Sequence, residues 1–258
     1  MNETSDKSIR KGIYILPNLL TTGALFAGFS AIVQATKGNF EVAAILIFVA
    51  MVLDGLDGRV ARMTNTTSEF GIQYDSLSDM VSFGLAPALV LYEWSLFSMG
   101  KIGWLVAFVY AVATALRLAR FNTHAADEKY FFQGLPSPSA AGILAAFIWV
   151  VNDYGLQGTD FKLITLFLTL AAAILMVSNV PFRSFKDFDL RSHVPFVVLL
   201  GIVIALVVIV YDPPRVLLTG FTIYLLSGPV SAILHRKKKK TENEVTTSVD
   251  DKDDEGVS

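Results

Sequence analysis

The sequence predicts an all-α protein, a bundle of about eight transmembrane helices with both termini in the cytoplasm. Three observations predict this class: an apolar composition, a series of long apolar segments and an uneven distribution of basic residues. Of the 258 residues, 53% are hydrophobic and 17% are charged, whereas soluble domains average about 25% charged residues. The mean hydropathy of +0.54 is that of a membrane protein.

The apolar segments set the expected helices. A helix needs about 20 mostly apolar residues to cross the hydrocarbon layer, and lipid excludes irregular backbone. The candidate spans are Ile13–Gln34, Phe40–Arg62, Ile72–Phe97, Ile102–Phe121, Ser139–Val151, Phe161–Val180, Val194–Val210 and Val216–Leu234. The fifth is short as written and is expected to begin nearer Pro136.

The basic residues indicate the orientation. If the spans alternate, 17 of the 21 Lys and Arg residues fall on one side of the membrane. The remaining basic residues are Lys37, Lys101, Lys162 and Arg215. Short cytoplasmic loops carry the excess of Lys and Arg, so the richer side is predicted to be the cytoplasm.

These spans divide the chain into four parts. Residues 1–12 form a cytoplasmic segment, 13–180 a catalytic core made of the first six spans, and 181–234 two additional helices. Residues 235–258 are a basic, then acidic tail that is expected to be disordered in the cytoplasm. The chain has no cysteine, which excludes disulfides and cysteine nucleophiles. Its basic residues are scattered among short loops, which argues against nucleic-acid binding.

Two pairs of aspartates are the most informative feature. Asp54 and Asp57 are three residues apart, and Asp75 and Asp79 are four apart, so each pair lies on one helical face. The polar stretch Met63–Phe70 joins the two helices into an antiparallel hairpin. All four carboxylates are therefore expected to converge near the cytoplasmic ends of their helices.

Bare carboxylates at membrane depth would each cost several kcal/mol to desolvate. One or two divalent cations would compensate them, and oxygen ligands suit Mg²⁺ or Mn²⁺. A cluster of ion pairs with Arg59 and Arg62 is the alternative interpretation.

Small residues accompany these carboxylates. Side chains are minimal at four positions of this stretch: Gly55, Gly58, Ala61 and Gly71. They would allow a nucleotide to approach the backbone closely. Arg62 can donate charge-assisted hydrogen bonds to a diphosphate.

This stretch resembles the signature of the CDP-alcohol phosphatidyltransferase family. Its fixed positions are Asp54-x-x-Asp57-Gly58-x-x-Ala61-Arg62, then Gly71, Asp75 and Asp79 after eight, three and three intervening residues. The resemblance implies that the four aspartates bind a pair of divalent metal ions and that Asp79 deprotonates the acceptor hydroxyl. It further implies that Gly58, Ala61 and Arg62 border the CDP group of CDP-diacylglycerol. It also implies a homodimer in a bacterial or archaeal cytoplasmic membrane.

The first helix carries a second, weaker resemblance. Its opening Pro17-Asn18-Leu19-Leu20-Thr21 is similar to the first helix of the family. In the family, the Asn and Thr of this helix lie near the nucleotide phosphates. Asn18 and Thr21 are therefore expected to bind CDP-diacylglycerol.

The acceptor is predicted from residues 117–138. Arginine can hold a carboxylate or phosphate with two parallel hydrogen bonds, although positive-inside arginines before an ordinary helix start would look the same. The runs Arg117-Leu-Ala-Arg120-Phe-Asn122 and Gly134-Leu-Pro-Ser-Pro138 are similar to those of membrane-integral family members that use L-serine. This similarity implies that Arg117, Arg120, Asn122 and Gly134 border the serine.

Three other functions remain open at this point. The same chemistry could use glycerol 3-phosphate or an inositol phosphate as the acceptor. An intramembrane prenyltransferase also uses Asp-rich pairs with Mg²⁺, but its pairs usually lie on well-separated helices. A cation transporter would place its acids near the bilayer midplane on several helices.

Overall fold

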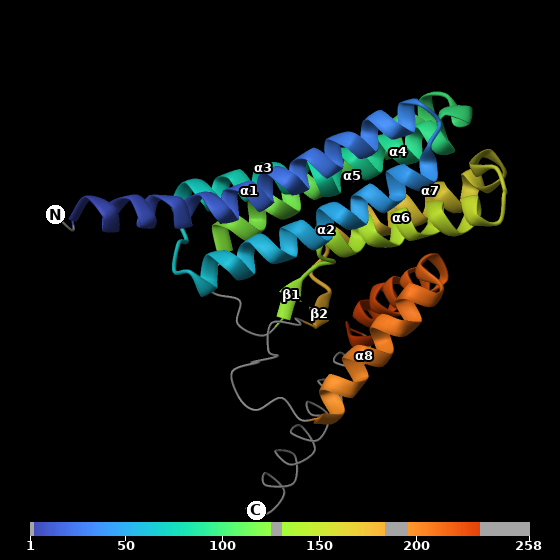
Figure 1. Cartoon of the computed structure of the whole chain (residues 1–258). Coiled ribbons are helices and arrows are strands. Elements are labelled where there is room, and N and C mark those ends of the chain that lie inside the picture. The colour runs from blue at the N-terminus through green and yellow to red at the C-terminus, as the bar shows by residue number, and fades with distance from the viewer. Residues whose placement is uncertain (1–2, 125–130, 184–195, 233–258) are drawn as a thin grey trace, which may run out of the picture.

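The computed structural model describes residues 3–124, 131–183 and 196–232 of the chain, and these are mostly helical (Figure 1). The α-helices are α1 (Glu3–Thr36), α2 (Phe40–Met63), α3 (Glu69–Asp79), α4 (Ala86–Trp94), α5 (Lys101–His124), α6 (Ser137–Asp153), α7 (Lys162–Val177) and α8 (Phe196–Tyr211). A further helix of residues 213–232, here the last helix, follows α8. The tail 235–258 lies outside the described residues.

Three short helical segments complete the order. They are the π-helix η1 (Met80–Leu85) and the 3₁₀-helices η2 (Leu96–Met99) and η3 (Gly158–Phe161). Because η1 joins α3 to α4 without a break, these three segments form one continuous rod, called the α3–α4 rod below. The described helical rods then correspond one to one with the predicted segments, so the helical class is confirmed.

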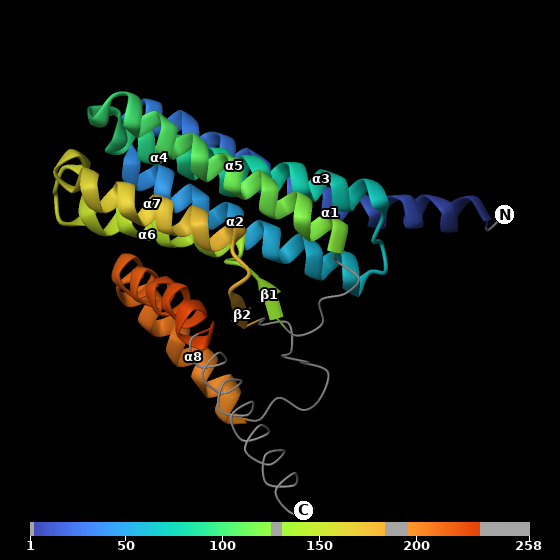
Figure 2. The same ribbon diagram turned by 180° about the vertical axis from the view of Figure 1, so that it is seen from behind.

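A two-stranded antiparallel ribbon was not predicted by the sequence analysis. Strand β1 (Phe131–Gln133) pairs with β2 (Pro181–Arg183), with Phe132 opposite Phe182. Both views of the ribbon diagram place it between the bundle of α1–α7 and the pair formed by α8 and the last helix (Figures 1 and 2). The ribbon thus joins the start of α6 to the end of α7.

Small side chains bring α1 and α2 together. The two helices are in extensive contact, and their buried residues include Ala27 and Ala31 on α1 and Ala43, Ala44 and Ala50 on α2. Small residues let helix backbones approach closely, which is a common mode of packing between membrane helices. This close contact fixes the position of the α2 aspartates relative to α1.

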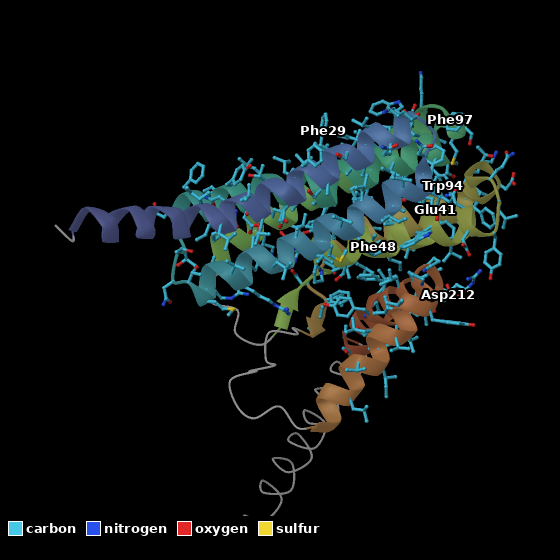
Figure 3. All side chains as sticks on the ribbon, in the orientation of Figure 1. Phe29, Glu41, Phe48, Trp94, Phe97 and Asp212 are labelled. Carbon is cyan, nitrogen blue, oxygen red and sulfur yellow. The ribbon has the colours of Figure 1, made fainter. Side chains whose placement is uncertain are left out.

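Large apolar side chains cover much of the outer surface. Phe29 on α1 is 58% exposed and Phe97 in η2 is 51% exposed (Figure 3). Among the described residues, three helical segments are long and apolar enough to cross a membrane: Ile15–Thr36, Lys101–Thr123 and Gly158–Val177. A surface of this kind requires a lipid environment, so the protein is a membrane protein.

The last helix packs against the core. The Phe221 and Phe48 rings lie 6.0 Å apart between centroids, which joins the last helix to α2. At the far end from the aspartates, Arg215 forms ion pairs with Asp153 at 2.9 Å and with Asp212 at 2.8 Å. Asp212 is labelled in Figure 3. The last helix is therefore attached to the bundle both near Phe48 and near Asp153.

Candidate active site

The reversal between α2 and α3 places the two aspartate pairs side by side. Helix α2 ends at Met63, and Asn65 takes a left-handed backbone conformation with φ of 52°, which asparagine tolerates better than most residues. The Ser68 hydroxyl then caps α3 by accepting a hydrogen bond from the Gly71 N–H at 3.0 Å. This tight turn returns the chain along α2, as the polar stretch predicted.

The carboxylates converge as expected from their spacing. Carboxylate oxygens of Asp54, Asp57 and Asp75 all lie within 4.8 Å of one another. The Asp54 carboxyl also interacts electrostatically with the Asp75 and Asp79 carboxyls. Ionised carboxylates this close repel one another, so a proton or a cation is needed to reduce the negative charge of the cluster.

Two buried carboxylate oxygens in this cluster favour a bound cation over a shared proton. Asp75 Oδ1 and Asp79 Oδ1 are buried and have no hydrogen-bond partner in the described part of the chain, an arrangement that is costly unless another ligand compensates it. Three carboxylates within one ion's reach form a set of hard oxygen donors. This donor set fits a divalent metal ion of the Mg²⁺ or Mn²⁺ type.

The ion-pair alternative finds no support among the described residues. Neither Arg59 nor Arg62 forms a salt bridge with any of the four aspartates there. Arg62 acts on Asp57 only through a longer-range electrostatic attraction. The arginines of α2 therefore leave the carboxylate oxygens available.

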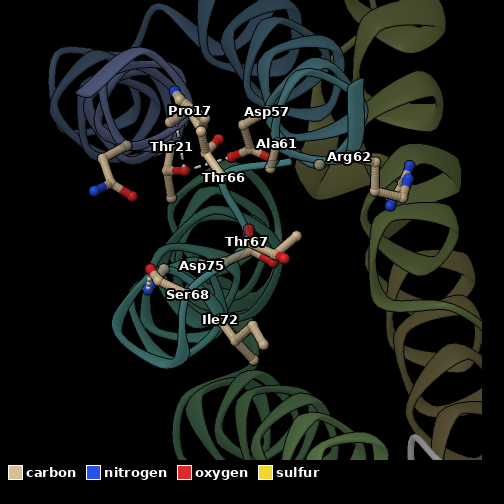
Figure 4. Close-up of a pocket in the computed structure, with 13 residues that line it drawn as sticks. Pro17, Thr21, Asp57, Ala61, Arg62, Thr66, Thr67, Ser68, Ile72 and Asp75 are labelled. Atoms are coloured by element: carbon tan, nitrogen blue, oxygen red, sulfur yellow. Dashed lines mark hydrogen bonds between the residues drawn. The ribbon is translucent and has the colours of Figure 1, made fainter. Parts of the chain in front are cut away.

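A cavity of about 180 Å³ opens beside the aspartates, between α1, α2 and α3 (Figure 4). Asp57 and Asp75 line it directly. Six of the predicted CDP-diacylglycerol residues line it as well: Asn18, Thr21, Gly58, Ala61, Arg62 and Gly71. Gly55 does not line it, and a Cβ added there would meet nothing within 4 Å.

Some lining residues were missed by the sequence analysis. They are Pro17, Thr66, Thr67, Ser68 and Ile72, mostly from the turn between α2 and α3. The polar composition of Met63–Phe70, between the two aspartate pairs, could have indicated that this turn lines the site. The turn therefore contributes hydroxyl groups to the cavity as well as joining the helices.

Close packing explains one of the glycines. A Cβ added at Gly71 would lie 3.1 Å from Ser68 Oγ and 3.6 Å from Asn18 Oδ1. A side chain at residue 71 would therefore crowd the Ser68 hydroxyl and reach ordinary contact distance of Asn18.

The predicted serine-binding residues lie outside this cavity, around the C-terminal end of α5. Arg117 is buried, donates a hydrogen bond from Nη1 to Ser137 Oγ at 3.0 Å, and acts electrostatically on Asp79. Arg120 donates to Asn179 Oδ1 at 2.8 Å. Arg117 is thus associated electrostatically with an aspartate of the cluster.

The remaining two predicted serine-binding residues, Asn122 and Gly134, contact neighbouring helices. Asn122 donates from Nδ2 to Ser76 Oγ at 3.0 Å, which links α5 to α3. Gly134 has a φ of +84°, and a Cβ there would lie 2.4 Å from the Met176 carbonyl oxygen. Glycine is therefore required at residue 134 by the backbone itself.

The fold and the site define a helical membrane protein with a cavity lined by carboxylates and small residues. The sequence model of the CDP-alcohol phosphatidyltransferase family matches residues 14–183, and the chain belongs to this family. It is 38% identical to a CDP-diacylglycerol–serine O-phosphatidyltransferase of Helicobacter pylori over 219 residues, which are 84% of this chain and 90% of the relative.

Two further relatives with the same name cover less of this chain. The Bacillus subtilis protein is 32% identical over 171 residues, which are 66% of this chain and 91% of the relative. The Methanocaldococcus jannaschii protein is 37% identical over 142 residues, which are 55% of this chain and 64% of the relative.

Proposed function

We propose that the protein transfers the phosphatidyl group of CDP-diacylglycerol to the hydroxyl of L-serine, which gives phosphatidylserine and CMP. One observation carries the proposal: Asp57 and Asp75 belong both to the carboxylate cluster and to the cavity bordered by the signature residues. A diphosphate bound in that cavity would meet a metal held by the cluster. The family membership and the names of the relatives support the same reaction.

The cavity residues would hold the CDP group. Arg62 supplies a guanidinium for the diphosphate, and Asn18 and Thr21 supply polar groups from α1. The small side chains of Gly58, Ala61 and Gly71 would leave room for the CDP group beside the backbone. Gly55, which does not line the cavity, remains in the proposal as a small residue between Asp54 and Asp57 that would let the nucleotide approach the backbone.

The aspartates would hold the metal. Asp54, Asp57 and Asp75 supply the ligands that lie within one ion's reach, and Asp79 adjoins them through Asp54. A bound pair of Mg²⁺ or Mn²⁺ ions would neutralise charge on the diphosphate and on the departing phosphate.

Asp79 is proposed to act as the general base. Its carboxylate takes the proton of the serine hydroxyl, and the serine oxygen forms a bond to the phosphorus that carries diacylglycerol. The bond from that phosphorus to the oxygen of the cytidine phosphate breaks. CMP leaves with the bonding electron pair.

Arg117 is the favoured ligand for the serine carboxylate, because it is the arginine of α5 that acts on Asp79. Arg120, Asn122 and Gly134 would shape the surrounding pocket through their links to α7 and α3. An acceptor that carries a carboxylate suits a buried guanidinium.

The proposed topology has eight transmembrane helices, with both termini and the aspartates on the cytoplasmic side of a bacterial or archaeal membrane. The count goes beyond the three helices that qualify by length and composition. Helix α2 carries charges near its end, and α6 and α8 are 17 and 16 residues long. A homodimer is part of the proposal through the family resemblance alone.

CMP release tests the reaction. Purified protein with CDP-diacylglycerol and Mg²⁺ or Mn²⁺ is given L-serine, glycerol 3-phosphate or inositol phosphate in separate assays. We expect metal-dependent CMP release with serine, together with formation of phosphatidylserine. Release with one of the other acceptors but not with serine would reject the acceptor and keep the phosphatidyl transfer.

A further inference from the structure

The α3–α4 rod changes its helical form directly after Asp79. The π-helix η1 begins at Met80, and the Ala86 N–H bonds to the Val81 carbonyl five residues back. π-Helical turns are rare and often occur at functional sites. Here the altered turn starts at the residue next to the proposed base.

Pro87 gives a physical reason for the π-helix. In a regular α-helix the N–H of residue 87 would bond to the Phe83 carbonyl, but proline has no N–H. Its ring would also clash with that carbonyl, which lies four residues earlier. The wider turn relieves this clash and leaves the Phe83 carbonyl without its usual donor.

Tyr110 of α5 supplies the missing donor. Its hydroxyl donates a hydrogen bond to the Phe83 carbonyl oxygen at 3.0 Å, and the whole side chain is buried. A buried carbonyl without a partner would be costly, so this bond stabilises η1. Thr114, one turn further along α5, lies against Gly84, where an added Cβ would be 3.2 Å from its methyl carbon.

Helix α1 holds the opposite side of the same segment. The Ser82 hydroxyl donates to the Ala24 carbonyl oxygen at 3.0 Å. A Cβ added at Gly28 would lie 2.7 Å from the Ser82 Cα. The segment is thus enclosed between α1 and α5, and both helices also act near the aspartates, through Thr21 and Arg117.

We propose that Tyr110 is a positioning residue for Asp79, and that its bond to the Phe83 carbonyl keeps η1 in the π-helical form that aims the base. The proposal rests on the role given to Asp79 in the proposed function. A regular α-helical turn after Asp79 would rotate that residue relative to the part of the rod packed against α5. A shift of about 1 Å in a reacting group can lower a rate roughly 100-fold.

The first test compares Tyr110→Phe with the wild type. The matched control is Tyr92→Phe, which alters a tyrosine of α4 beyond the π-helix. For Tyr110→Phe we expect kcat for CMP release to fall about 10-fold or more, with KM for both substrates and the affinity for Mn²⁺ within about 2-fold. Amide hydrogen exchange of the Met80–Leu85 segment should be faster in Tyr110→Phe and unchanged in the control.

Pro87→Ala provides a second test that separates positioning from stability. Alanine restores an N–H for the Phe83 carbonyl and favours a regular helix. We expect slower exchange of the Met80–Leu85 amides and a thermal midpoint that does not fall, yet a lower kcat. If Tyr110→Phe does not fold, Pro87→Ala still tests whether the π-helical form of η1 is needed for turnover.

Two results would overturn the proposal. One is wild-type kcat and wild-type exchange in Tyr110→Phe. The other is wild-type kcat in Pro87→Ala when exchange shows that the segment has become more regular. A wild-type protein that releases no CMP would instead contradict the proposed function, and the exchange comparison would still test whether Tyr110 holds η1.

Discussion

The Thr21 hydroxyl of α1 lies 2.6 Å from Asp57 Oδ2 of α2, and both residues line the cavity (Figure 4). The same hydroxyl lies 3.1 Å from the Pro17 carbonyl oxygen. A hydroxyl has one proton, so the shorter contact to the carboxylate identifies its acceptor. Thr21 thereby fixes the direction of the Asp57 carboxylate and would leave its other oxygen for the proposed metal.

Thr21→Val should therefore weaken metal binding. Loss of a hydrogen bond to a charged group costs about 1.5–3 kcal/mol, which corresponds to a roughly 10- to 150-fold rise in the metal concentration for half-maximal activity. Titration of Mn²⁺ against CMP release measures it. Thr22→Val, one residue along on the exposed side of α1, is the control and should change little. Equal metal dependence of the two variants would contradict the role of Thr21.

The aspartates should separate into two groups. Asp79 lies outside the set whose oxygens come within 4.8 Å of one another. Asp79→Asn should thus lower turnover by about 100-fold or more while Mn²⁺ binding, followed by electron paramagnetic resonance, remains. Asp57→Asn should lose Mn²⁺ binding. Loss of binding in both variants would argue that Asp79 is a main metal ligand.

Arg117→Ala should impair the use of serine. A lost charge-assisted hydrogen bond costs about 1.5–3 kcal/mol, or a roughly 10- to 150-fold rise in KM for serine. The KM for CDP-diacylglycerol should change little, because Arg62 and the metal hold the diphosphate. Steady-state kinetics with each substrate varied separately provides the measurement.

Two further variants sharpen this experiment. Arg120→Ala should have a smaller effect, since Arg120 bonds to Asn179. Arg59→Ala, on the exposed surface of α2, is the matched control. An unchanged KM for serine in Arg117→Ala would reject Arg117 as the carboxylate ligand.

Labelling can test the orientation, because the chain has no cysteine of its own. Met63 at the end of α2 is 84% exposed, and Lys37 lies exposed at the opposite end of the helix pair. An impermeant thiol reagent added to intact cells should label Lys37→Cys and spare Met63→Cys. The reverse pattern would invert the proposed topology.

Two glycines of the last helix should respond in opposite ways to alanine. At Gly228 an added Cβ would lie 2.3 Å from Cζ of the buried Phe182 ring, whereas at Gly220 it would meet nothing within 4 Å. Gly228→Ala should cost about 1–3 kcal/mol of stability through overpacking. Gly220→Ala should be neutral or gain up to about 1 kcal/mol in helix propensity. Thermal unfolding in detergent compares them; similar midpoints would mean that the last helix does not pack tightly on β2.

The sequence by itself determined the helical class, the places of the helices and the convergence of the aspartate pairs. These features follow from local periodicity: Asp54 and Asp57 share a face because three residues make almost one helical turn. The short polar turn after Met63 then allowed only an antiparallel neighbour. The signature around Gly58 and Arg62 pointed to the cavity for the same local reason.

Only the tertiary structure decided which groups meet across helices. The bond from Thr21 to Asp57 joins residues 36 positions apart, and no periodicity encodes it. Gly134, predicted as a substrate contact, proved to be required by a left-handed backbone against the Met176 carbonyl.

The form of the α3–α4 rod after Asp79 is likewise not encoded by its local sequence. Ile72–Phe97 reads as one apolar span, and Pro87 within it signals an irregularity without specifying its form. Whether the helix kinks, breaks or widens depends on what satisfies the freed Phe83 carbonyl. Tyr110 provides that partner from α5, 27 residues away in the chain, so the π-helix is a product of packing between helices.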